Sequence, residues 1–260
     1  MMRSLWTAAT GMIAQQLNID VISNNLANVN TIGFKKSRAE FEDLMYQNQK
    51  IAGATTQAGE IIPTGIQVGM GVRPTTVHKF FSQGDYQNTS NSLDLAIEGD
   101  GFFLVDVNGE DAYTRAGAFK LNNDGTVVTA NGYKLQPEFT VPTDTVSIEV
   151  SEDGHISALD SSGTELAGAD IKLYTFINPA GLRASGRNLY YPTEASGDAT
   201  EGTPGDTNVG TIAQGYLEMS NVEIVDEMVN MIVGQRAYEV NSKAITTADS
   251  MLGIANQLKR

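Results

Sequence analysis

Residues 22–36 read I22-S-N-N-L-A-N-V-N-T-I-G-F-K-K36, and this stretch decides how the first part of the chain is interpreted. Its apolar residues Ile22, Leu26 and Val29 keep a helical spacing. Asparagines stand between them, although an asparagine amide competes with the backbone for hydrogen bonds and disfavours helix. We interpret these amides as groups that pair with a neighbouring chain. The simpler alternative is that they end the helix and face solvent.

The helical spacing extends back toward the N-terminus. Two series repeat every seven residues and are offset by three: Leu5, Met12, Ile19 and Leu26, and Ala8, Gln15, Ile22 and Val29. This is the a/d pattern of a coiled-coil seam. It predicts a helix over residues 4–31 that ends near Gly33, because glycine favours the left-handed residue after a helix.

The C-terminal part carries the same repeat, with one change of phase between Ile232 and Ala237, near Gly234. Its members are Val222, Val225, Val229, Ile232, Ala237, Val240, Ala244, Thr247, Met251, Ile254 and Leu258. The pattern predicts a helix over residues 221–258, which would be roughly 57 Å long at about 1.5 Å per residue. Such a length is unusual for a helix within an ordinary globular core.

The middle of the chain is typical of antiparallel β-structure. Short alternating segments are separated by pairs that suit the positive φ angles of hairpin turns. These pairs are Asn108-Gly109, Asp124-Gly125, Asn131-Gly132, Asp153-Gly154 and Ser162-Gly163. The sequence therefore predicts a series of β-hairpins.

Together these patterns predict an α+β fold in which discontinuous N- and C-terminal coiled-coil helices flank a mainly antiparallel β central domain. We expect a terminal helical assembly domain of residues 1–45 plus 215–260. Extended connector segments should cover 46–82 and 193–214, and the β-rich central domain should cover 83–192.

Charge and composition exclude several classes. The net charge is −14, and residues 84–220 hold 21 Asp and Glu against 6 Lys and Arg. Nucleic-acid binding, which needs basic surfaces, is therefore not expected. No apolar run reaches the length of a membrane-spanning helix, and the N-terminal segment is expected to be retained as structure rather than cleaved as a signal peptide.

No pattern indicates catalysis. The chain has no cysteine, no G-x-S-x-G motif and only two histidines, His78 and His155, which are expected to be surface or strand residues. The segments 122–126 and 152–154 resemble calcium loops only faintly and are better explained as turns. We expect no enzymatic activity, no metal, no cofactor and no small-molecule substrate.

The two heptad patterns are the strongest functional candidates, because they carry small and polar residues that suit close packing among several helices. We predict a subunit interface formed by Leu5, Met12, Ile19, Ile22, Asn24, Asn25, Leu26, Asn28, Val29, Val225, Val229, Ile232, Ala237, Val240, Ala244, Met251, Ile254 and Leu258. The connector, with Tyr46, Ile61, Pro63 and Val72, is expected to reach an adjacent subunit.

Several of these motifs resemble those of a known family. Residues 23–36 and 220–244 are similar to the N- and C-terminal signatures of the axial proteins of the bacterial flagellum, that is, the rod, hook and hook-associated proteins. The segments 96–105, 113–119 and 130–136 resemble the β-domain of hook and rod proteins. The length of the chain and its connector favour a rod member over a hook member.

The resemblance implies a structural subunit of the flagellar basal body that stacks helically into a hollow, torque-transmitting shaft. Its implied partners are further copies of itself, proximal rod and hook subunits, and the peptidoglycan and outer-membrane rings around the rod. It also implies export through the flagellar type III apparatus without a cleaved signal peptide. Our own hypothesis is that the termini are disordered in the monomer and become ordered on docking. Within the family, the alternative is a proximal rod or hook-type axial protein. Outside it, the alternative is a secreted, trimeric adhesin-like β-protein.

Overall fold

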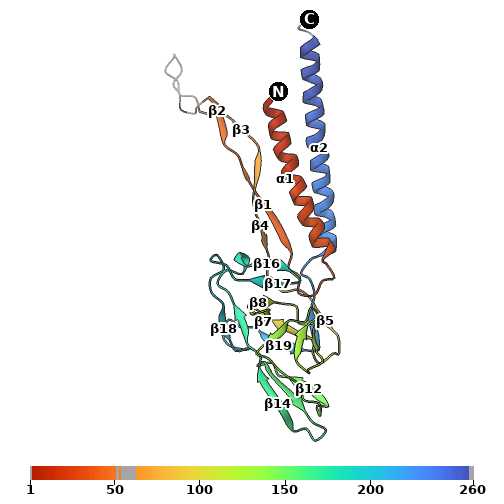
Figure 1. Cartoon of the computed structure of the whole chain (residues 1–260). Helices are drawn as coiled ribbons and strands as arrows, with labels where there is room; N and C mark the ends of the chain where they lie inside the picture. Colours follow the sequence, from red (N-terminus) through yellow and green to blue (C-terminus); the bar gives the residue numbers. More distant parts are fainter. Residues whose placement is uncertain (1, 51–52, 54–62, 258–260) are drawn as a thin grey trace. The chain divides into compact units, whose positions relative to one another are not determined.

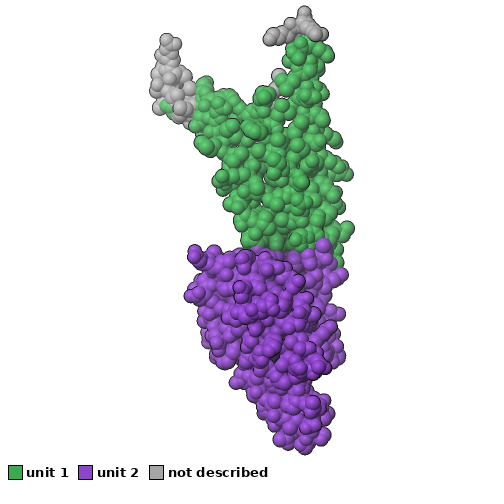
Figure 2. All heavy atoms as spheres, viewed as in Figure 1, with its two compact units in different colours: residues 1–26, 37–78, 224–260 green, residues 27–36, 79–223 purple. Residues whose placement is uncertain are grey.

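The computed structural model describes residues 2–50, 53 and 63–257 and divides into two compact units (Figures 1 and 2). Unit 1 consists of Met1–Leu26, Ser37–His78 and Ile224–Arg260. Unit 2 consists of Ala27–Lys36 and Lys79–Glu223. Both units are discontinuous in sequence, so each needs segments from the two ends of the chain.

Unit 1 holds the two long helices, α1 (Met2–Ala27) and α2 (Ile224–Gln257), which run side by side (Figure 1). It also holds two antiparallel ribbons. One pairs β1 (Ser37–Asp43) with β4 (Val72–Lys79), and the other pairs β2 (Tyr46–Lys50) with β3 (Ile66–Gly69). A backbone hydrogen bond from Leu44 to Gly71 joins the ends of these ribbons.

Unit 2 is built from short antiparallel strands arranged in one large sheet and three small ones. The large sheet contains β7 (Phe102–Val107), β8 (Glu110–Thr114), β9 (Phe119–Leu121), β10 (Val127–Thr129), β11 (Lys134–Gln136), β15 (Leu173–Thr175), β16 (Arg183–Gly186), β17 (Leu189–Tyr191) and β18 (Thr200–Gly202). The small sheets pair β6 (Leu95–Glu98) with β19 (Thr211–Gln214), β5 (Tyr86–Asn88) with β20 (Tyr216–Glu218), and β12 (Ser147–Val150) with β13 (His155–Leu159) and β14 (Glu165–Asp170).

The predicted hairpins are confirmed. Asn108-Gly109 joins β7 to β8, and both residues have positive φ angles, of 57° and 89°. The other four predicted turns likewise connect β9 to β10, β10 to β11, β12 to β13 and β13 to β14. These local signals are reliable because a tight turn between antiparallel strands requires backbone conformations that glycine and asparagine adopt readily.

Two cores hold unit 2 together. The larger one lies among β6, β7, β8, β13, β15 and β19, and its most deeply buried side chains include Ile97, Phe103 and Leu173. The smaller one is aromatic, with Phe102, Tyr113, Phe176 and Tyr190 in edge-to-face contacts. Because Ile212 of β19 pairs with Ile97 of β6, the larger core depends on a late segment of the chain.

Two expectations need correction. The first helix ends at Ala27 rather than at residue 31, because the chain turns after Asn28, whose carbonyl accepts a hydrogen bond from the Thr31 N–H. The segment 193–214, expected as a connector, contains β18 and β19, which pair with β15 and β6 in unit 2. Its low-complexity composition concealed these strands. The α+β class and the mainly antiparallel β-structure are confirmed.

Gly33 offers a test of the packing around the segment that follows α1. Its φ angle is +67°, and an added Cβ would lie 2.7 Å from the backbone nitrogen of Ala116. Gly132 has a similar φ of +85° but nothing within 4 Å. Each alanine substitution should lose about 1–2 kcal/mol because of the left-handed backbone, and Gly33→Ala should lose clearly more because of the overlap. Urea unfolding followed by the near-UV tyrosine signal measures both; equal losses would contradict the packing described here.

Candidate functional site: helix faces and the buried signature

The two helices of unit 1 are antiparallel and pack closely. Gly11 of α1 faces Asn241 of α2, and Gly234 of α2 faces Ile19 of α1, each at a distance that a Cβ would make tight. The buried residues of α2, Glu227, Gly234 and Ala248, fit a repeat of seven positions, with the half-buried Asn241 at the remaining place. Met231, Ile245 and Leu252 are also half-buried. Small residues on both helices therefore allow the backbones to approach each other.

The opposite face of α2 is exposed and apolar. Ten large hydrophobic side chains of this helix are more than 40% exposed: Ile224, Val225, Met228, Val229, Ile232, Val233, Tyr238, Val240, Met251 and Ile254. If the antiparallel pairing of Gly11 with Asn241 continues along both helices, Met2 lies opposite about residue 250. The end of α2 therefore extends beyond the start of α1. The exposed ion pair of Arg236 and Glu239 lies among these apolar side chains. Many large apolar side chains exposed on one helix nevertheless mark a site of association.

Most of the stripe predicted on α2 lies on this exposed face. Val225, Val229, Ile232, Val240, Ala244, Met251 and Ile254 are exposed, Ala237 is half-buried, and Leu258 lies outside the described residues. The predicted stripe is therefore not the one that contacts α1. Sequence reasoning missed this stripe of seven-residue spacing because a glutamate, a glycine, an asparagine and an alanine are not typical seam residues.

The predicted stripe on α1 faces inward instead. Ile22 is buried, and Leu5, Met12, Ile19 and Leu26 are half-buried. The exposed apolar residues of α1 are Met2, Trp6 and Ile13, which the heptad series did not include. The helix nevertheless has only two charged residues, Arg3 and Asp20, which is few for a helix with one face in water.

The amide of Asn25 is used within the chain. Its side chain is 2% exposed; Nδ2 donates to the Ser37 carbonyl (2.8 Å) and to Glu227 Oε2 (3.2 Å), and Oδ1 accepts from the Ser37 N–H (2.9 Å). Asn25 thus fixes the start of β1 and the first turn of α2 to the end of α1. These hydrogen bonds explain why an amide side chain stands at this position of an otherwise apolar helix face.

The other asparagines differ from Asn25. Asn24 is exposed, and Asn28 and Val29 are half-buried in the turn that follows α1, where Asn28 Oδ1 accepts from the Thr31 hydroxyl. Asn28 and Val29 thus follow the end of the helix, whereas Asn24 lies within it. Their place in an interface with another subunit stays a prediction.

The last part of the signature enters the interior of unit 2. Lys35 is fully buried, and its Nζ lies 2.5 Å from Glu218 Oε1. Arg115 Nε lies 2.9 Å from the other carboxylate oxygen, Oε2, and the Gly84 N–H donates to Oε1 at 3.0 Å. We call Lys35, Arg115 and Glu218 the ionic cluster. Sequence analysis did not single out these contacts, because the partners are 103 and 183 residues apart.

Burial and mutual attraction compete in the ionic cluster. Burial alone would raise the pKa of the Glu218 carboxyl, but Arg115 and Lys35 outweigh it and hold that pKa below its usual value. Burial, and then the nearby Arg115, lower the pKa of Lys35 although Glu218 opposes the change. The carboxylate is therefore the group that holds the cluster together.

The connector lies partly outside the described residues. Tyr46 and Pro63 are exposed, Val72 is half-buried, and Ile61 is not among the residues described. The N–H of Val72 is 3.5 Å from the Thr10 hydroxyl of α1, and Gly71 also packs against Thr10. The base of the connector is therefore held against α1, whereas the described residues of β2 are exposed.

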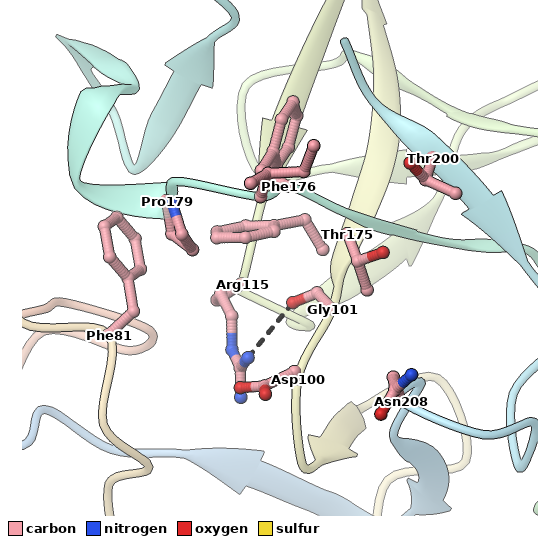
Figure 3. A pocket seen from close by; sticks show the side chains of 11 residues that line it. Phe81, Asp100, Gly101, Arg115, Thr175, Phe176, Pro179, Thr200 and Asn208 are labelled. Carbon is pink, nitrogen blue, oxygen red and sulfur yellow. Dashed lines mark hydrogen bonds between the residues drawn. The ribbon is translucent and has the colours of Figure 1, made fainter. Parts of the chain in front are cut away.

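A pocket of about 460 Å³ lies beside the aromatic core of unit 2 (Figure 3). Phe81, Phe102 and Phe176 line it together with Arg115. The guanidinium of Arg115 already donates to the carbonyls of Gly101 and Gly99 as well as to Glu218. The charged guanidinium in the wall is thus committed to contacts within unit 2.

The described part of the chain gives little support to other functions. In residues 2–50, 53 and 63–257 no group of three or more His, Asp and Glu side chains could hold a metal ion. His78 lies in β4, and His155 lies in β13, where it pairs with Asp170. Neither described helix is both long and apolar enough to span a bilayer.

Comparison with protein families identifies the class. Residues 5–35 match the flagella basal body rod protein model, residues 96–158 match the D1 domain of the flagellar hook protein FlgE/F/G, and residues 213–258 match the C-terminal model of the flagellar basal body rod FlgEFG proteins. The matched segments contain both helices, the signature and the first part of the β-domain. The chain is thus built as an axial protein of the flagellum.

Comparison with individual proteins is more specific. The flagellar basal-body rod protein FlgG of Borreliella burgdorferi is 51% identical over 100% of both chains. The FlgG proteins of Caulobacter vibrioides (47% identical over 99% of this chain and 100% of the relative) and Bacillus subtilis (43% over 100% of both) are also similar. The chain belongs to the FlgG family of flagellar basal-body rod proteins. It is a structural subunit of the distal rod in the basal body, where it assembles with other rod and hook components.

Asn25 offers a direct test of the junction between α1, β1 and α2. Asn25→Ala would leave the Ser37 backbone groups and the Glu227 carboxylate without their buried partner, and the loss of stability should be about 2–3 kcal/mol. The matched control is Asn230→Ala, an exposed asparagine of α2. Thermal unfolding followed by the helical circular dichroism signal measures both. If the two variants melt alike, the Asn25 amide does not fix the junction.

Proposed function

We propose that copies of this chain polymerise helically through the outer faces of α1 and α2 and so form a hollow shaft that transmits torque from motor to hook. The observation that carries the proposal is the exposed apolar face of α2. Such a face is costly to leave in water, and each Å² of apolar surface removed from water contributes about 25 cal/mol.

The outer face of α1 supports the same conclusion. Met2, Trp6 and Ile13 are 76%, 66% and 62% exposed. Since the helix has almost no charge, its outer surface suits a second protein surface better than it suits water. The α1–α2 pair therefore offers two apolar faces beyond the seam that it buries internally.

These two faces differ in sequence and size. This difference helps to decide whether the assembly is an open filament or a closed ring. Contact between unlike surfaces of identical subunits is heterologous, and it gives an open helical filament when the rotation does not close. A rod needs this geometry. A closed trimer, as in the adhesin-like alternative, would require a rotation that returns to the first copy.

The more specific partners are also a proposal, which the family membership supports. We propose that the connector around β2 and β3 contacts an adjacent copy and stiffens the shaft. The assembled shaft would join proximal rod subunits at one end and hook subunits at the other, and peptidoglycan and outer-membrane ring proteins would surround it. Export through the flagellar type III apparatus without a cleaved signal peptide, and ordering of the termini on docking, remain predictions.

Charge placed on the outer face of α2 should prevent assembly. In the double variant Val229→Asp/Ile232→Asp, both positions are more than half exposed in the single chain. The fold of one copy should therefore persist, whereas the concentration needed for polymerisation should rise at least ~100-fold because unpaired charges are costly to bury. Sedimentation at increasing protein concentration measures the effect.

The control for this variant is Val146→Asp, since Val146 is an apolar residue of unit 2 that is 70% exposed. It should polymerise as the unchanged chain does. Normal polymerisation of the α2 double variant would refute the proposed interface. A fixed trimer of the unchanged chain at all concentrations would favour the adhesin-like alternative.

Trp6 provides a spectroscopic reporter, because it is the single tryptophan of the chain and lies on the outer face of α1. Its fluorescence emission should shift to shorter wavelength when copies polymerise, since an aromatic side chain that enters an interface leaves water. The Val229→Asp/Ile232→Asp variant serves as the non-assembling control. Polymers that form with unchanged emission would show that this face of α1 stays exposed.

A further inference from the structure

The ionic cluster joins three parts of unit 2 that are far apart in sequence. Lys35 comes from the segment 27–36, Arg115 follows β8, and Glu218 ends β20. All three side chains are at most 2% exposed. Long charged side chains are rarely buried to this extent unless each is paired.

The charges of the cluster are unequal in number. Two cations share one buried carboxylate, and both oxygens of that carboxylate are occupied. Asp100, the other acidic group that acts on Lys35, is exposed. Removal of Glu218 would therefore leave two cations in the interior without a buried counter-charge, whereas removal of Lys35 would leave the balanced pair of Arg115 and Glu218.

Further hydrogen bonds, which involve the backbone, join the segments that carry Lys35 and Glu218. The Gly33 N–H donates to the Glu218 carbonyl at 2.8 Å, and the Lys36 N–H donates to Asn221 Oδ1 at 2.7 Å. The amide of Asn221 in turn donates to the carbonyls of Phe80 and Ser82. The segments 33–36 and 218–221 thus form one continuous junction at the ionic cluster.

We propose that the ionic cluster is a folding lock, which makes the closure of unit 2 conditional on the presence of both ends of the chain. Before the segment that carries Glu218 arrives, Arg115 cannot enter the interior without an unpaired charge, and Lys35 has no carboxylate to bind. The core around β6 to β8 therefore stays open until β19 and β20 add their strands and the counter-charge. The lock acts within one copy and is independent of the assembly proposed above.

The test uses the full-length chain and hydrogen exchange of the amides in β7 and β8. Glu218→Gln keeps the shape of the side chain but removes its charge, and it should raise the unfolding equilibrium constant of the whole core at least ~100-fold. Lys35→Met should have a smaller effect. The double variant Glu218→Gln/Lys35→Met should be more stable than Glu218→Gln alone, because it removes one of the unpaired cations. The control is Glu201→Gln, whose ion pair with Lys172 is partly exposed and should contribute little.

The outcomes separate a lock from a local contact. If Glu218→Gln increases exchange only in β20 and leaves β7 and β8 protected, the cluster does not control closure and the proposal fails. It fails also if Lys35→Met adds to the loss in the double variant instead of relieving it. If Glu218→Gln does not fold at all, recovery of folding in the double variant supports the lock, and equal failure of both variants while the control folds contradicts it.

Discussion

One buried carboxylate, that of Glu218, determines much of this structure. It accepts from Lys35, Arg115 and the Gly84 N–H, and so connects the end of the N-terminal signature, a loop after β8 and the strand that precedes α2. Buried ion pairs contribute little net stability compared with apolar packing, but an unpaired buried charge is strongly destabilising. The cluster therefore specifies which segments come together.

The helices of unit 1 show how one sequence can satisfy two kinds of contact. Their inner seam combines aliphatic residues of α1, such as Ile19 and Ile22, with small and polar residues, including Gly11, Gly234 and the bonded pair of Asn25 and Glu227. Large aliphatic residues lie on the outer face of α2. A seam of small residues lets two backbones approach, whereas a broad aliphatic face gains free energy mainly when further protein covers it. This division of the helix surface is what a subunit of a multi-helix shaft requires.

Local features of the fold could be predicted from the sequence, and remote ones could not. Pairs such as Asn108-Gly109 predicted the hairpins, because turn geometry depends on two residues alone. The heptad repeat predicted two long helices but did not reveal that a different stripe of α2 faces α1, because periodicity shows that a face is apolar without showing what covers it. The partners of Asn25 and Lys35 could not be found, because each depends on a residue that only the tertiary fold brings near. The resemblance to flagellar axial proteins supplied the function, whereas the residue chemistry supplied mainly exclusions.

The central claim is that the signature acts within one copy while the outer helix faces act between copies. An electron cryomicroscopy reconstruction of the assembled polymer at side-chain resolution tests it most directly. The account predicts that Val229 and Ile232 contact a helix of another copy, and that Asn25 and Lys35 keep their partners Ser37, Glu227 and Glu218 in their own chain. A polymer in which the outer face of α2 is bare, or in which Asn25 and Lys35 bind a neighbouring copy, would contradict it.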